Sequence, residues 1–139
     1  MTIDTTYKAT ISNDLKEMKR ILIDLSDFLK SHQIPDKLLY IVNLAIEEPL
    51  GIIISYGSKG HLPLTIQIEV KIHPKSILIL IVDNGRTFNP LSVPHLDLRK
   101  AAIDRPAKEL SMHLVRNIME SMWYERKDGK NIFQIQLER

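Results

Sequence analysis

The sequence predicts an α+β fold: a two-layer α/β sandwich in which a mixed, mainly antiparallel sheet of about five strands carries three helices on one face. The first observation behind this is the order of hydrophobic patterns: strand, helix, helix, strand, strand, irregular segment, helix, strand, strand. The second is a strict alternation from Leu64 to Ile72, which is typical of a sheet covered on one side only. At 139 residues, we expect one domain spanning 1–139.

The N-terminal part predicts a strand followed by a long helix. Residues 3–11 alternate between apolar and polar side chains, as a half-buried strand does. Ser12 or Asn13 can cap the next helix, with Asp14 in its first turn. That helix is predicted to run to about Ser31, because apolar residues recur at spacings of three and four: Leu15, Met18, Leu22, Leu25 and Leu29.

A second helix is predicted from about Pro35 to the glycines that begin at Gly57. Proline suits the first turn of a helix because its missing amide has no partner there. The apolar face of this helix comprises Leu38, Ile41, Val42, Ala45 and Ile46. Two adjacent acids, Glu47 and Glu48, then precede Pro49 and Gly51 at a point where a helix should be strongest.

The remaining elements are strands, an irregular segment, a helix and a hairpin. Residues 64–72 form the alternating strand, and the continuously apolar residues 77–82 predict a central strand. Residues 86–106 show no stable periodicity, and Ala107 to about Glu120 predicts a third helix. Residues 122–126 and 132–137 flank an Asp128-Gly129 turn, which predicts a closing hairpin.

Composition excludes several classes of function. Nineteen basic and seventeen acidic residues are interspersed, so no face or tail predicts direct nucleic-acid binding. There are no cysteines, and the five histidines lack ligand spacing, so we predict no disulfide framework and no metal site built on them. No uninterrupted apolar run approaches the ~20 residues of a membrane span, and no signal peptide begins the chain, so we expect a soluble, cytoplasmic protein.

Two segments could carry chemistry. Asp83 follows a buried strand and precedes Gly85, so its carboxylate could receive a ligand amino group where the backbone also comes close; alternatively, this is a turn in which Asp83 and Asn84 bond their own backbone. Glu48 shares a helical face with core residues, where a carboxylate can activate a hydroxyl or water. The alternative for Glu48 is a salt bridge or a partly solvated acid.

Four ordered motifs resemble the GHKL-type histidine-kinase-like ATPase domain, and most closely its small bacterial anti-sigma-factor serine kinases. Residues 44–48 (LAIEE) are similar to the start of the family's N-box, and residues 83–90 (DNGRTFNP) to the box that follows a buried strand. Residues 112–120 (MHLVRNIME) resemble the last helix of the family, and residues 124–131 (YERKDGKN) its closing hairpin. The likeness covers nearly the whole chain.

The resemblance implies roles for individual residues. Glu48 falls where the general base lies, and Asp83 falls where the amino group of adenine is held. Gly85 would let the backbone approach the base, and Tyr56 falls where the family has an aromatic residue or histidine near the nucleotide. Phe88, within the second motif, belongs to the same implied ATP site. Lys108 and Ser111 bound the segment that corresponds to the phosphate-binding glycines.

Three departures from the family pattern bear on the chemistry. The asparagine that supplies an oxygen to magnesium falls on Ile52, which has no lone pair to give. The phosphate-binding glycines fall on residues 108–111, where β-carbons hinder approach to phosphate and Glu109 would repel it. Pro49 removes a helix amide beside Glu48. The adenine side of the pocket therefore matches the family, whereas the triphosphate side does not.

Three functions remain open from the sequence. The first is an anti-sigma-like protein that binds a sigma factor or an anti-anti-sigma antagonist, with weakened or lost Mg-ATP chemistry. The second is an active ATP-dependent serine kinase that phosphorylates such an antagonist. The third is a small-ligand sensor that uses the adenine-side pocket. The resemblance also implies a homodimer.

Overall fold

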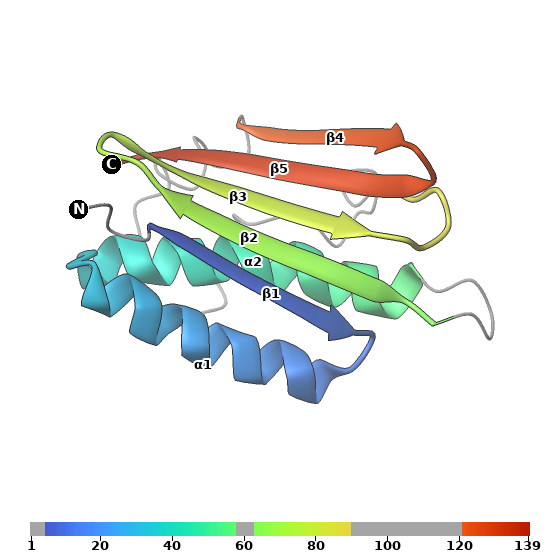
Figure 1. Cartoon of the computed structure of the whole chain (residues 1–139), viewed down its shortest axis with the longest axis horizontal. Helices are drawn as coiled ribbons and strands as arrows, with labels where there is room; N and C mark the ends of the chain where they lie inside the picture. The colour runs from blue at the N-terminus through green and yellow to red at the C-terminus, as the bar shows by residue number, and fades with distance from the viewer. Residues whose placement is uncertain (1–4, 58–62, 90–120) are drawn as a thin grey trace.

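A computed structural model describes residues 5–57, 63–89 and 121–139 of the chain (Figure 1). The third helix predicted near 107–120, and the irregular segment beyond Asn89, lie outside the described residues. The described elements, in chain order, are β1 (Thr6–Ser12), α1 (Leu15–Ser31), α2 (Asp36–Tyr56), β2 (Thr65–Ile72), β3 (Ser76–Asp83), β4 (Met122–Lys127) and β5 (Lys130–Glu138).

The strands form one five-stranded sheet in the order β1-β2-β3-β5-β4. Every pairing among the described strands is antiparallel, which agrees with the mainly antiparallel sheet of about five strands that the sequence predicts; no parallel pair occurs among these strands. Short hairpins explain the pairing of β2 with β3 and of β4 with β5, because a chain that reverses in a tight turn must pair antiparallel. β3 lies in the middle of the sheet, as its apolar sequence predicts.

Asp128 and Gly129 form the turn of the last hairpin. Both have positive φ, 53° and 74° respectively. Two-residue turns with positive φ at both positions match the right-handed twist of the flanking strands, and Asp-Gly is a favoured sequence for them. The predicted hairpin is therefore confirmed, turn included.

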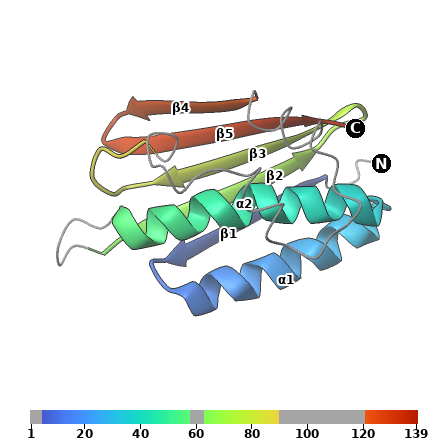
Figure 2. The same cartoon turned by 180° about the vertical axis from the view of Figure 1, so that it is seen from behind.

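Both described helices cover the same face of the sheet, while the other face carries no described element (Figures 1 and 2). Alternate residues of β2 are buried against the helices, and those between them point away. The same period of two holds in β3 and β5. Fully buried side chains from the sheet and from α2 meet in this one layer, among them Leu44, Ile46, Ile53, Ile68, Ile79, Ile81, Phe133 and Ile135.

The start of α1 differs from the prediction. Asp14 caps the helix by accepting a 2.8 Å hydrogen bond from the Lys16 amide, so neither Ser12 nor Asn13 is the cap. Ser12 instead ends β1, and both its amide and its hydroxyl donate to the carboxylate of Glu17. These two hydrogen bonds hold the pKa of Glu17 below its ordinary value. Spacing alone could not choose among three adjacent capping residues.

α2 continues without interruption through Pro49 as far as Tyr56, and it is preceded by Pro35 as its cap residue. It is the one described helix that is long and apolar enough to cross a membrane by length and composition. Its burial gives a sufficient reason for that composition, because Val42, Ala45 and Leu50 are inaccessible to solvent within the domain. The core helix of a two-layer fold is apolar around most of its circumference.

The inward side chains of β3 should dominate stability. Ile79 is fully buried, so Ile79→Ala is expected to lower the free energy of unfolding by about 2–5 kcal/mol through lost burial and a residual cavity. Ile23→Ala on α1 is the control, because 65% of Ile23 is exposed; its effect should stay within about 0.5 kcal/mol. Urea denaturation measures both values. Equal losses for the two variants would contradict the assignment of the core.

Candidate functional site

One face of α2 passes from the core to a surface cavity near its C-terminal end. Ile41 and Ala45 on this face are buried, Glu48 is partly buried, and Tyr56 is 42% exposed. Ile52 lies between the two polar positions and is only 7% exposed. The predicted common face of these residues is therefore present in the folded chain.

The cavity at this face has a volume of about 360 Å³. Glu48, Ile52 and Tyr56 line it together, with Ser55 and Gly51 from the same helix. The remaining lining residues are Met18 of α1 and Glu47 of α2. The cavity thus holds two carboxylates and two hydroxyl groups, and the aliphatic side chain of Ile52 lies where the resemblance implies a metal-binding amide.

Asp83 lies apart from that cavity, in a buried network at the end of the sheet. Its side chain is 3% exposed, and its Oδ1 accepts hydrogen bonds from the Gly85 amide at 2.8 Å and from Asn131 Nδ2 at 2.9 Å. Asn131 stands directly opposite Asp83 in the pairing of β3 with β5. The bond from Gly85 is the local turn contact that was the alternative to a ligand site.

Asn131 connects this network to the loop that follows β3. Its Nδ2 also donates to the Arg86 carbonyl at 2.7 Å, and its Oδ1 accepts from the Phe88 amide at 3.2 Å and the Tyr124 hydroxyl at 2.6 Å. With Asp83, the amide has four partners and is only 2% exposed. A buried amide that makes all its hydrogen bonds orders the groups around it.

Asn131 is not among the site residues that the motifs predict, although the sequence contains a signal for it. Phe133, Ile135 and Leu137 alternate along β5 and face the core. Continuing that period of two backward places Asn131 on the same buried face. A polar side chain in an otherwise apolar inward register is the observation that could have identified it.

The backbone of Gly85 lies close to the backbone of Gly57 rather than to an open pocket. A β-carbon at this position would lie 2.2 Å from the carbonyl oxygen of Gly57, at the end of α2. The neighbouring Arg86 amide donates to that carbonyl at 3.1 Å, and Arg86 Nε donates to the Tyr56 carbonyl at 2.8 Å. The loop after β3 therefore satisfies two carbonyls that the helix end leaves without intrahelical partners.

An aromatic cluster lies beside this contact. The rings of Tyr56 and Phe88 stack with centroids 6.1 Å apart, and the guanidinium carbon of Arg86 lies 5.7 Å from the centre of the Phe88 ring. Both aromatic residues of the predicted ATP site are thus brought together. Tyr56 joins this cluster to the cavity that contains Glu48.

Burial raises the pKa of Asp83 above its ordinary value, because desolvation disfavours the carboxylate. The hydrogen bonds from Asn131 and Gly85 oppose the rise, as does the positive charge of Arg126. Arg126 is held nearby by a 2.9 Å bond from its Nη1 to the Gly85 carbonyl.

The chain matches the histidine kinase-like ATPase domain over residues 11–137, and it belongs to that family. This agrees with the antiparallel sheet, the one-sided helices and the acidic residue at the end of β3. A further comparison finds similarity to the serine/threonine-protein kinase BtrW of Bordetella bronchiseptica, with 26% identity over 96 residues that cover 68% of this chain and 67% of that protein.

The family implies nucleotide binding, but the described residues do not fit its magnesium-ATP site. Ile52 offers no oxygen where the resemblance places a magnesium ligand. Across residues 5–57, 63–89 and 121–139, no three His, Cys, Asp or Glu side chains are grouped to hold a metal. Lys108 and Ser111 lie outside these ranges.

The two glycines near the site should respond oppositely to alanine. Gly85→Ala is expected to destabilise the fold by about 1–3 kcal/mol or more, because its methyl group would collide with backbone at Gly57. Gly51→Ala is the matched control: its new methyl group meets nothing within 4 Å and lies in a helix, so a gain of about 0.5–1 kcal/mol is expected. Thermal and urea unfolding distinguish the two. A neutral Gly85→Ala variant would refute the close contact.

Asp83→Asn tests the buried carboxylate, because asparagine resembles its protonated form and keeps an acceptor oxygen. Since the folded-state pKa of Asp83 is raised, the stability that this group contributes is present below its unfolded pKa and is lost as pH rises through the folded pKa. The variant should therefore gain stability relative to the natural chain at about pH 7 and lose that advantage towards pH 3.5.

Urea denaturation at several pH values measures this difference. A packing change caused by the substitution would change the free energy of unfolding equally at low and at neutral pH. The difference between the two pH values therefore reports on the carboxylate. Asp27→Asn, at an exposed position of α1, is the control. An advantage that grows as the pH falls would contradict the predicted sign.

Proposed function

We propose that this chain is a cytoplasmic regulatory protein of the anti-sigma-factor type that acts mainly by binding another protein. In this proposal its Mg-ATP chemistry is weakened or lost. Its partner is a sigma factor, an anti-anti-sigma antagonist, or both, and it acts as a homodimer. Membership of the histidine kinase-like ATPase family and the similarity to a serine/threonine-protein kinase support this class of function.

The observation that carries the proposal is Ile52 in the wall of the cavity beside Glu48. Magnesium requires near-octahedral oxygen coordination and gives up its water ligands reluctantly. An isoleucine in place of a ligand removes one coordinating oxygen and puts an apolar group against a hydrated ion. Glu48 alone retains the position of a general base, but a base without a positioned metal and phosphate has no reaction to promote.

Residues next to Ile52 and Glu48 also support weakened Mg-ATP chemistry. Pro49 follows Glu48 directly and leaves α2 without one backbone amide, although the helix continues. At the adenine side, Asn131 and Gly85 already donate to Asp83 Oδ1. In this proposal the chain keeps the fold and the acids of the family, while Ile52 replaces the group that would hold magnesium.

Calorimetric titration with ATP and ADP, with and without magnesium, tests this directly. We expect no tight magnesium-dependent binding of ATP, and no transfer of labelled γ-phosphate to a candidate antagonist of the anti-anti-sigma type. Complex formation with a sigma factor or antagonist should persist without nucleotide, and size-exclusion chromatography of the mixed proteins measures it.

Glu48→Gln and its neighbour Glu47→Gln form the matched pair for this experiment. The opposite result would be phosphate transfer that requires magnesium and is abolished by Glu48→Gln but not by Glu47→Gln; the chain would then be an active serine kinase. A third outcome, in which adenosine and ADP do not bind while an unrelated metabolite raises the melting temperature, would favour the small-ligand sensor.

A further inference from the structure

Asn84 is the only asparagine in the sequence that is followed by a glycine. This dipeptide is chemically labile, because glycine has no side chain to keep its backbone nitrogen away from the side chain of the asparagine. The nitrogen can attack the asparagine Cγ and close a five-membered succinimide ring. By contrast, Asn43 precedes a leucine and Asn131 precedes an isoleucine, whose side chains hinder the same attack.

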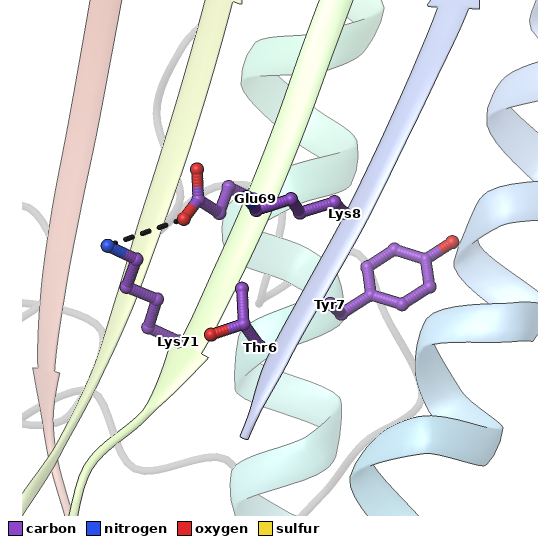
Figure 3. Close-up of a pocket in the computed structure, with 5 residues that line it drawn as sticks. All are labelled: Thr6, Tyr7, Lys8, Glu69 and Lys71. Atoms are coloured by element: carbon purple, nitrogen blue, oxygen red, sulfur yellow. Dashed lines mark ion pairs between the residues drawn. The ribbon is translucent and has the colours of Figure 1, made fainter. Parts of the chain in front are cut away.

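Asn84 lies on the surface directly after β3, so water can reach it. It lines a cavity of about 210 Å³ together with Thr65 and Lys130. A larger cavity of about 730 Å³ lies near the start of β1, where Lys71 and Glu69 form an ion pair at 3.4 Å (Figure 3). The described lining of the larger cavity holds no amide side chain, so the labile group belongs to the smaller one.

Both reacting groups of this dipeptide are engaged in hydrogen bonds in the folded chain. Oδ1 of Asn84 accepts from the Thr65 amide at 2.8 Å, which directs the carboxamide towards β2. The Gly85 amide donates to Oδ1 of Asp83 at 2.8 Å, which directs the attacking nitrogen towards a different carboxyl group. Ring closure therefore requires both hydrogen bonds to break.

The backbone around Gly85 is held as well. Its carbonyl accepts from Nη1 of Arg126 at 2.9 Å, and the next amide, that of Arg86, donates to the Gly57 carbonyl at 3.1 Å. A β-carbon on Gly85 would lie 2.2 Å from that same Gly57 oxygen, so the two backbones are in close contact. Ring closure requires the peptide between Asn84 and Gly85 to rotate, and these contacts oppose the rotation.

We propose that Asn84 and Gly85 form a site of spontaneous deamidation, which the fold protects while the loop after β3 contacts α2 and which reacts when that contact opens. In the open loop the Gly85 nitrogen bonds to Cγ of Asn84 and gives up its proton. The bond from Cγ to Nδ2 breaks, and Nδ2 leaves as ammonia with that proton. The reaction requires no nucleotide, metal or partner protein, so it does not depend on the proposed function.

Water then opens the succinimide ring in one of two ways. Hydrolysis at Cγ gives aspartate with an unchanged main chain, and its side-chain oxygen can still accept from the Thr65 amide. Hydrolysis at the main-chain carbonyl gives isoaspartate, in which the main chain runs through the side chain and gains one carbon. That carbon is added directly before Gly85, which has no space beside Gly57. Isoaspartate should therefore keep the loop from regaining its contact with α2.

Incubation of the full chain at mildly alkaline pH tests the protection. Trypsin releases residues 76–86 as one peptide, and mass spectrometry measures the conversion of its amide to an acid. The folded chain is expected to deamidate at least about 10-fold more slowly than the same chain unfolded in urea. Equal rates in the two states would overturn the proposal, and so would the absence of reaction in the unfolded chain.

Thr65→Pro and Thr65→Ala form a matched pair. The proline removes the amide that holds the Asn84 side chain, at the first residue of a strand, where proline is tolerated. It should raise the rate in the folded chain at least about 3-fold, whereas alanine keeps the amide and should leave the rate unchanged. Circular dichroism checks folding, and if Thr65→Pro does not fold, Arg86→Ala replaces it, because it removes the bond from Nε to the Tyr56 carbonyl. A folded variant of either kind that reacts no faster than Thr65→Ala would contradict the protective role of these contacts.

The effect of isoaspartate on the loop is measured on the isoaspartate form purified from aged protein. Asn84→Asp is its matched control, because it carries the same added charge on an unchanged main chain. The isoaspartate form is expected to unfold at a lower urea concentration than Asn84→Asp, and its Gly85 and Arg86 amides should exchange with solvent at least about 10-fold faster. Identical unfolding and exchange for the two forms would overturn the inferred opening of the loop.

Discussion

The hydrogen bond between Asn131 and Asp83 joins β5 to the end of β3, and the rest of the candidate site depends on it. Asp83 is buried with a carboxylate that burial disfavours, so its donors are needed to keep the group in place. The same amide of Asn131 holds the Arg86 carbonyl and the Phe88 amide, so one side chain sets the path of the loop. The conformation of that loop is therefore specified by a strand that lies far away in sequence.

The loop after β3 also fixes the position of the C-terminal end of α2. Arg86 donates to two carbonyls at the C-terminal end of the helix, and Gly85 is small enough to let the two backbones touch. Because a helix is rigid along its length, fixing its end relative to β3 also places the residues one and two turns earlier. The cavity that contains Glu48 thus owes its position to contacts at Gly57. The loop beside Asp83 therefore cannot move without disturbing the helix that carries Glu47 and Glu48.

Most of the fold could be predicted from periodicity, whereas most of the site geometry could not. Alternation in residues 64–72 is a local property, and it correctly indicated a sheet buried on one side. The spacing of apolar residues does not show that every described strand pair is antiparallel. It also does not show which of three adjacent polar residues caps α1, a position that Asp14 takes in the structure. The contact of Gly85 with Gly57 and the pairing of Asp83 with Asn131 join distant segments, and no local pattern encodes which side chain will face which. The inward register of β5 was the available signal for Asn131, but it identifies a buried polar residue rather than its partners.

Two residues that depart from the family pattern, Pro49 and Ile52, are compatible with the fold. Ile52 is nearly buried, so it adds apolar surface to the core where an amide would have required a polar partner. Pro49 is buried within a helix that continues through it to Tyr56. Stability resides in the layer between the sheet and the helices, where the buried apolar side chains meet. An isoleucine at position 52 therefore belongs to the core itself, so a chain of this family can carry an apolar side chain here and keep its fold.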